Sequence, residues 1–167
     1  MDPTSDPTTY PTGRPTARPT ADPTADPTTR PALRRSPAVH HLAIVVADLA
    51  RAEAFYAGVL GLEVITRHAD AAGAPRAVWL ALGAQGAFLA LERAPVDAPV
   101  DAPWRGDAAP GLHCLALPID AASRQIWRFH VTSAGHAVER ESAFTLYVRD
   151  PDGCLVALSH HPTPADL

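Results

Sequence analysis

The chain has 167 residues, a formal net charge of -4 and an apolar content of 47%, which allows one domain, or one domain plus a tail. No apolar run approaches the roughly 18 residues of a membrane span, and no basic segment followed by an apolar one indicates a secretory signal. The acidic balance gives no electrostatic reason to expect nucleic acid. We therefore expect a cytoplasmic protein that binds neither nucleic acid nor membrane. Its 14 basic residues are all arginine, which with abundant Ala and Pro suggests a GC-rich bacterial origin.

Residues 1–37 contain a tetrapeptide repeat in which Pro recurs every fourth residue from Pro3 to Pro31. Proline removes backbone donors and fixes φ, and the segment has almost no apolar residues to offset the entropy of ordering. The pattern predicts a disordered tail, partly in the polyproline II conformation. It is a linker or docking tail on one interpretation, and a passive extension or a start codon assigned too far upstream on the other. Residues 164–167 are interpreted as a short C-terminal tail.

The first ordered module spans residues 39–94 and reads as strand, helix and three strands. The strands are expected at His40–Val46, Leu62–Arg67, Arg76–Leu82 and Ala87–Arg93. Asp48 is a candidate N-cap for a helix with apolar residues at helical spacing from Leu49 to Leu60, which Gly61 ends. The pattern of this module is βαβββ.

The same order recurs over residues 111–161, after a linker at residues 95–110 that includes Trp104. The strands are expected at Leu112–Ile119, His136–Glu141, Ala143–Arg149 and Cys154–His160. Asp120 is the candidate N-cap of a helix that places Ala122, Ile126, Phe129 and Ser133 on one face and ends at Gly135. The tetrapeptide from Asp150 to Gly153 (Asp-Pro-Asp-Gly) is a strong hairpin-turn signal.

The two modules are related as an internal repeat, because the residues around His41 match those around Cys114 at an offset of 73. A module of about 55 residues buries too little surface to be stable alone, and internal repetition is itself a signal of fold. The prediction is an α+β domain at residues 38–163, in which two βαβββ modules form a curled mixed sheet around a cleft.

Three segments of the repeat carry a resemblance to a known family. They are the His-x-x-x-x-Val-x-Asp pattern at His41–Asp48, Ala-Phe-Tyr-x-x-Val-Leu-Gly-Leu at Ala54–Leu62, and Leu-Tyr-Val-Arg-Asp-Pro-Asp-Gly at Leu146–Gly153. Together they resemble the vicinal oxygen chelate superfamily of glyoxalases, bleomycin resistance proteins and extradiol dioxygenases. The resemblance covers Val39–Pro162. It implies a fold and does not choose one activity, since this fold hosts many.

In metal-dependent members of that family, each module lends side chains to one divalent ion. The resemblance places the four usual ligand positions at His41, Ala90, Cys114 and Ala157, so His41 is the one that keeps the usual ligand type. Cys114 is a candidate ligand as a thiolate that suits zinc, and Glu92, two residues past Ala90 on the same strand face, is a further candidate. A catalytic ion normally needs at least three protein ligands. We therefore expect no resident cofactor, with a divalent metal left as the alternative.

The leading hypothesis is a metal-independent protein that sequesters a small apolar or aromatic molecule in its cleft. The residues expected to line this cleft are His41, Trp79, Phe88, Cys114, Tyr147 and Arg149. His40 and His113 have the opposite strand parity and are expected to face away.

Several alternatives stay open from the sequence. One is a metal-dependent lyase, isomerase or dioxygenase with a rearranged ligand set; another is a metal-free enzyme with His41 as general base. Cys114 is interpreted first as a small buried apolar residue, and a disulfide with Cys154 is the less common outcome for such a chain. The sequence also leaves a homodimer open.

Overall fold

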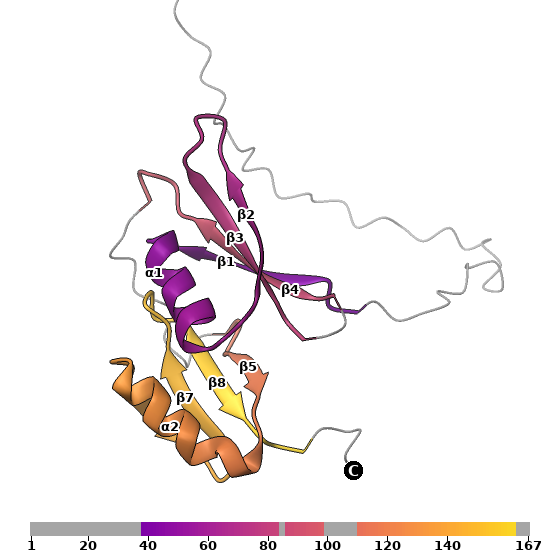
Figure 1. Ribbon diagram of the computed structural model, residues 1–167, viewed down its shortest axis with the longest axis vertical. Coiled ribbons are helices and arrows are strands. Elements are labelled where there is room, and N and C mark those ends of the chain that lie inside the picture. Colours follow the sequence, from indigo (N-terminus) through magenta and orange to yellow (C-terminus); the bar gives the residue numbers. More distant parts are fainter. Residues whose placement is uncertain (1–37, 84–85, 99–109, 163–167) are drawn as a thin grey trace, which may run out of the picture. The chain divides into compact units, whose positions relative to one another are not determined.

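The computed structural model describes residues 38–83, 86–98 and 110–162. The Pro-Thr repeat of residues 1–37, Trp104 and the C-terminal residues 163–167 lie outside the described residues. The elements in chain order are β1 (His41–Val46), α1 (Leu49–Glu53), the π-helical η2 (Ala54–Val59), β2 (Val64–Ala69), β3 (Pro75–Ala81), β4 (Phe88–Arg93), β5 (Leu115–Pro118), the 3₁₀ turn η3 (Ala121–Ser123), α2 (Arg124–Ser133), β6 (Val138–Glu141), β7 (Thr145–Arg149) and β8 (Leu155–Ser159) (Figure 1). No helix among these residues is long and apolar enough to cross a membrane.

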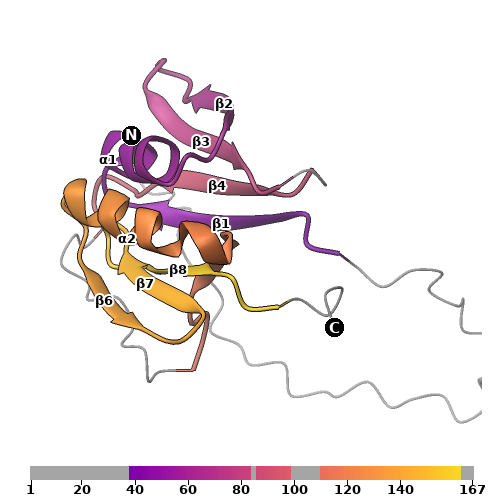
Figure 2. The same ribbon diagram turned by 60° about the horizontal axis from the view of Figure 1, so that its bottom comes forward.

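The strands form two four-stranded mixed sheets with the same topology, in the orders β1-β4-β3-β2 and β5-β8-β7-β6. In each sheet the first strand of the module runs parallel to the last, and the other neighbours are antiparallel. Figures 1 and 2 show each sheet with the helix of its own module. The predicted fold class of two βαβββ modules is confirmed.

The alternation along β1 decides which face of the first sheet is buried. Leu42, Ile44 and Val46 face the core, and the residues between them are exposed. The helical side chains Phe55 and Tyr56 pack against this inner face, each 1% exposed. The inner faces of both sheets contribute to one hydrophobic cluster, which explains why neither module needs to be stable alone. We call the opposite face of each sheet its open face.

The first helix begins and ends where the sequence predicts. The Asp48 side chain accepts a hydrogen bond from the backbone N–H of Arg51 at 3.0 Å, as an N-cap does. The chain leaves the helix at Gly61, whose φ of +74° lies in the left-handed region that favours glycine. The second half of this helix is a π-helix over Ala54–Val59, which apolar periodicity alone does not predict.

The second helix differs from the sequence prediction in two respects. The Asp120 side chain makes no capping hydrogen bond; its carbonyl instead accepts one from the Ser123 hydroxyl. The predicted face of Ala122, Ile126, Phe129 and Ser133 is exposed, with Ile126 at 70% and Phe129 at 74%. The buried position is Val131, which is 0% exposed.

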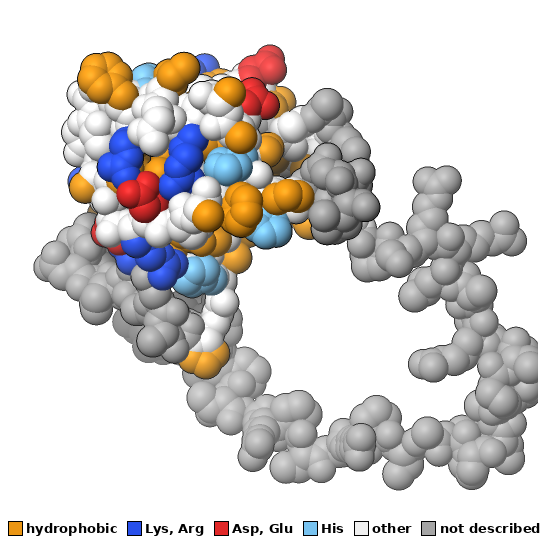
Figure 3. All heavy atoms as spheres, turned by 90° about the horizontal axis from the view of Figure 1, so that it is seen from below, with side chains coloured by type: hydrophobic (Ala, Val, Ile, Leu, Met, Phe, Trp, Pro, Cys, Tyr) orange, Lys and Arg blue, Asp and Glu red, His pale blue; other side chains and the backbone are white. Residues whose placement is uncertain are grey.

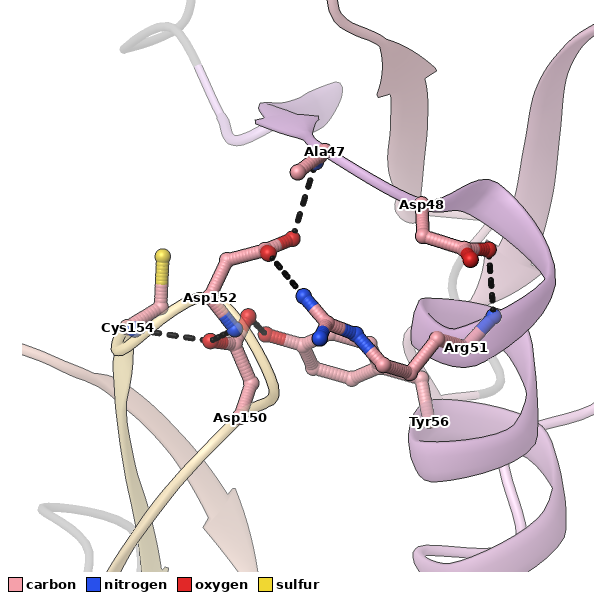
Figure 4. A network of polar contacts seen from close by, with 7 residues as sticks. All are labelled: Ala47, Asp48, Arg51, Tyr56, Asp150, Asp152 and Cys154. Atoms are coloured by element: carbon pink, nitrogen blue, oxygen red, sulfur yellow. Dashed lines mark hydrogen bonds and ion pairs between the residues drawn. The ribbon is translucent and has the colours of Figure 1, made fainter. Parts of the chain in front are cut away.

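The predicted hairpin turn from Asp150 to Gly153 joins the two modules. Tyr56 donates its hydroxyl hydrogen to Asp150 Oδ2 at 2.9 Å in a buried contact. One residue further into the turn, Asp152 accepts hydrogen bonds from Arg51 Nη2 at 2.7 Å and from the backbone N–H of Ala47 at 3.0 Å. Figure 4 shows these carboxylates reaching from the turn to the first helix and to the segment before it. The turn therefore fixes the second module against the first through three hydrogen bonds.

Candidate functional site

A row of aromatic rings crosses the open face of the first sheet. The strand register pairs His41 with Phe88 and places Trp79 and His68 on the same face in β3 and β2. The rings of His41 and Phe88 are stacked with centroids 4.9 Å apart, and those of Phe88 and Trp79 are stacked at 4.5 Å. The His68 and Trp79 rings lie 4.4 Å apart in a tilted arrangement. Four rings, one from each strand, thus form a continuous surface that we call the ring row.

Two polar atoms of the ring row have no hydrogen-bond partner among the described residues. They are the Trp79 indole nitrogen Nε1 and the His68 nitrogen Nε2, and both atoms are buried. A buried polar atom without a partner is costly, and native structures usually satisfy it with protein, water or a bound molecule. This end of the ring row therefore holds two polar atoms with unused hydrogen-bonding capacity, and both are closed to solvent in this arrangement.

The other end of the ring row carries two imidazoles instead of one. His40 was predicted to face away, but it precedes β1, so strand parity does not apply to it. Its ring lies 5.1 Å from that of His41 and 5.5 Å from that of Phe88. The two Nδ1 atoms of His40 and His41 are 2.8 Å apart, so one of them carries a hydrogen and the other accepts it.

The open face of the second sheet has its own polar cluster around Tyr147. The register places Arg140 of β6 opposite Tyr147 of β7. The Arg140 Cζ lies 4.4 Å from the centroid of the Tyr147 ring, and Arg140 Nη2 lies 2.8 Å from His113 Nε2. His113 was also predicted to face away; it lies two residues before β5, so strand parity does not apply to it either. No sequence motif had pointed to Arg140.

Arg149, which the sequence placed in the cleft, lies next to the hairpin turn. Its Nε donates to Glu139 at 2.9 Å, and its Nη1 donates to the carbonyl of Gly153 at 2.7 Å. These contacts give Arg149 a part in holding the turn.

The two cysteines are free thiols that line one small, mostly apolar cavity with Leu42 and Ile44. Burial raises the pKa of the Cys114 thiol, and the nearby Arg140 charge partly opposes this. The pKa of Cys154 is raised to about 12, first by burial and then by the Asp150 charge. A nucleophilic cysteine needs a lowered pKa, so both environments favour the neutral thiol.

The four positions that the family resemblance assigns to metal ligands do not supply a donor set for a divalent ion. Ala90 and Ala157 are buried alanines with 3% and 2% exposure. Glu92 forms an ion pair with Arg76 at 3.2 Å. Within residues 38–83, 86–98 and 110–162, no group of three His, Cys, Asp or Glu side chains is placed to hold a metal ion. The described residues do not fit the three-ligand requirement.

Four of the six predicted cleft residues fall into two clusters, and Cys114 and Arg149 lie outside both. His41, Phe88 and Trp79 contact one another on the first sheet, joined by His68. Tyr147 lies on the second sheet, where Arg140 and His113 join it. Cys114 lines the cavity beside the core. His68 and Arg140 lie on the open faces of β2 and β6. Side-chain alternation along a strand could have placed them there, but only once the strand register was known.

The chain belongs to the Glyoxalase/Bleomycin resistance protein/Dioxygenase superfamily, whose family model matches residues 38–158. The family is the one that the sequence motifs indicated. No curated protein matches the chain.

Solved structures with the same fold include a glyoxalase/dioxygenase from Nostoc punctiforme, which is 21% identical with a TM-score of 0.62, over 86% of this chain and 100% of that one. The fosfomycin resistance protein FosX from Mesorhizobium loti is 15% identical with a TM-score of 0.60, over 78% and 97%. A variant of FosX from Listeria monocytogenes, in complex with Mn(II) and 1S,2S-dihydroxypropylphosphonic acid, is 16% identical with a TM-score of 0.60, over 78% and 98%. These identities show the shared fold.

Proposed function

We propose that this protein binds a planar aromatic small molecule on the ring row, without the divalent metal of its metal-dependent relatives. The observation that carries the proposal is the continuous stack of His41, Phe88 and Trp79. Because the stacked rings turn their faces to one another, the row offers a ligand mainly their edges. Edge-to-face contacts with an aromatic ligand contribute beyond their buried area. Sequestration of a drug or metabolite is the corresponding activity.

The floor around the ring row supports this proposal. Ala43, Ala77 and Ala90 lie on the same face as the rings, so no large side chain separates neighbouring rings. The Nε1 atom of Trp79 and the Nε2 atom of His68 are buried without a partner among the described residues, so a rotation of these rings on ligand binding would bring them to a polar atom at the edge of the ligand. An apolar surface with a few converging polar groups is the usual composition of a small-molecule site.

The test is a thermal-shift screen of the full chain with planar aromatic compounds, followed by calorimetry on each compound that raises the melting temperature. Trp79→Leu and Phe88→Leu remove rings from the row, and we expect each to weaken binding about tenfold, the effect of losing an aromatic contact. Phe144→Leu is the matched control, because Phe144 is a partly exposed aromatic residue that precedes β7 in the second sheet. Equal loss in Phe144→Leu, or no stabilising compound at all, would count against the proposal.

A metal-dependent lyase, isomerase or dioxygenase is the second candidate, and one observation favours it. The two Nδ1 atoms of His40 and His41 lie close enough to converge on one ion, although they supply two donors of the three required. Elemental analysis of the untagged protein from metal-supplemented cells decides between the candidates. About one equivalent of a transition metal that is lost in His41→Ala would replace the first proposal by the second.

A further inference from the structure

The arginines of the described residues are almost all paired with carboxylates. Those with an Asp or Glu partner are Arg51, Arg67, Arg76, Arg93, Arg124, Arg128 and Arg149. Arg140 is the exception within residues 38–83, 86–98 and 110–162: its contacts there are to a tyrosine ring and a histidine. Its positive charge is therefore not compensated by a neighbouring carboxylate in this part of the chain.

The carboxylates nearest to Arg140 in sequence bind other arginines. Glu139 accepts hydrogen bonds from Arg149 Nε at 2.9 and 3.0 Å. Glu141 accepts from Arg124 at 3.0 Å and also forms an ion pair with Arg128 of the same helix. Figure 3 shows one face of the molecule, on which basic side chains lie next to an acidic one. The strand β6 thus presents a cation whose two flanking anions already have partners.

The guanidinium of Arg140 is also held in a defined position. Its Cζ lies 4.4 Å from the centroid of the Tyr147 ring, directly across the strand pair. Its Nη2 donates to His113 Nε2 at 2.8 Å, which requires that this nitrogen of His113 carries no hydrogen. Contacts to the ring and to one nitrogen fix the plane and leave Nε, Nη1 and the second hydrogen of Nη2 without a hydrogen-bond partner among the described residues, so Nη2 still forms a fork with Nε or with Nη1. A fixed guanidinium with free donors matches the two oxygens of an oxyanion.

The residues next to Tyr147 on this face are small. The register continues from Tyr147 to Ala157 of β8 and then to Ala116 of β5. Ala116 is exposed, whereas Ala157 is covered at 2% exposure. Arg140 itself is exposed, and an incoming anion does not have to displace a side chain from it.

We propose that Arg140, positioned by Tyr147 and His113, binds the carboxylate or phosphoryl group of a small anionic ligand on the open face of the second sheet. The inference rests on the proposed ligand-binding function of this domain and adds a negative charge to the description of what it binds. Bidentate pairing with an oxyanion is the interaction at which arginine exceeds other side chains.

The experiment is an amide NMR titration of the full chain at low ionic strength with three probes: benzoate, phenyl phosphate and neutral benzamide. Saturable shifts of amides in β6 and β7 are expected with benzoate or phenyl phosphate and not with benzamide, and the comparison of the two anions identifies the preferred oxyanion. Arg140→Gln should weaken the anion about tenfold or more, as loss of a charge-assisted bidentate contact does. Arg67→Gln is the control, because Arg67 is an exposed and paired arginine of the first sheet.

Two further variants test the positioning role of Tyr147. Tyr147→Phe keeps the ring beneath the guanidinium and should retain binding, whereas Tyr147→Leu removes the ring and should weaken it. Equal affinity of Arg140→Gln and the unaltered protein, equal shifts with benzamide and benzoate, or no anion binding would each overturn the inference.

Failure of this inference is distinguishable from failure of the proposed function. Binding of a neutral aromatic compound that is sensitive to Trp79→Leu, together with no anion binding, would overturn the Arg140 inference alone. Anion binding that depends on Arg140, in a protein that takes no compound on the ring row, would support the inference and remove the proposed aromatic site.

Discussion

The hydroxyl of Tyr56 lies 2.9 Å from Asp150 Oδ2, and this buried hydrogen bond joins the helix of the first module to the hairpin turn of the second. Both residues belong to the motifs that carried the family resemblance, Ala-Phe-Tyr and Arg-Asp-Pro-Asp-Gly. Asp150 Oδ1 meanwhile accepts the backbone N–H groups of Asp152 and Cys154 at 2.9 and 2.7 Å. One carboxylate therefore shapes the turn and contacts the other module (Figure 4).

Tyr56→Phe should lower the free energy of unfolding by about 1–3 kcal/mol, because it leaves a buried carboxylate oxygen without its donor. Urea unfolding at neutral pH measures this loss. Arg51→Gln is a suitable comparison: it removes the ion pair to Asp152, but Arg51 is 54% exposed, so its loss should cost below about 1 kcal/mol. A smaller effect for Tyr56→Phe than for Arg51→Gln would contradict the importance of the buried contact.

The Asp150 carboxyl should give an unusual pH dependence. Burial raises its pKa above the ordinary 3.8, although the hydrogen bonds from Tyr56 and two backbone N–H groups oppose the rise. A raised pKa means that the folded state holds the proton more tightly than the unfolded state. The stability contributed by Asp150 is therefore complete below pH 3.8 and is lost as the pH rises through the folded-state pKa.

Urea unfolding of the unaltered protein and of Asp150→Asn between pH 3.5 and 7 tests that dependence. As the pH rises, the unaltered protein should lose unfolding free energy relative to Asp150→Asn. Carboxyls with lowered pKa values, such as Asp70 and Glu141, lose their contribution as the pH falls, but they are present in both proteins and cancel. If instead the unaltered protein gains unfolding free energy relative to Asp150→Asn as the pH rises, the pKa of Asp150 in the folded state is lowered.

The orientation of α2 can be tested by substitutions on its two faces. Val131→Ala removes buried methyl groups at a position with no exposure and should lower the unfolding free energy by roughly 2 kcal/mol. Phe129→Ser alters a side chain that is 74% exposed and should stay within about 0.5 kcal/mol of the unaltered protein. Thermal unfolding of both variants measures these losses, and a larger loss in Phe129→Ser than in Val131→Ala would mean that the face of Ile126 and Phe129 is the buried one.

The same helix shows why its buried face could not be read from the sequence. Ile126 and Phe129 stand three residues apart, whereas Trp127 and Val131 stand four apart, so both pairs give an apolar stripe at helical spacing. Packing against the sheet selects the second stripe. In β1 the choice was simpler, because a two-residue period leaves only two faces and the larger aliphatic side chains, Leu42 and Ile44, lie on one of them.

The sequence offered only part of the ring row. His41, Phe88 and Trp79 were expected to line one cleft, and they lie inside strands on one face of the first sheet. His40 and His113 precede their strands, where alternation has no meaning. Arg140 lies next to a register irregularity in β6, and β2 has irregularities on either side of the Thr66–His68 segment. A one-residue slip moves a side chain to the opposite face, so their contacts required the structure.

The two thiols should react slowly and at different rates. The pKa of Cys154 is raised to about 12 and that of Cys114 is raised less strongly, so at pH 8 the thiolate fraction of each is small, and the thiolate is the reactive form. We expect a disulfide reagent such as dithionitrobenzoate to modify Cys154 more slowly than Cys114 in the two single-cysteine variants, and both rapidly in urea. Asp150→Asn should speed Cys154 by removing the charge that raises its pKa, whereas Arg140→Gln should slow Cys114 by removing the opposing cation. Equal rates for all folded variants would show that access to the small cavity, and not ionisation, limits the reaction.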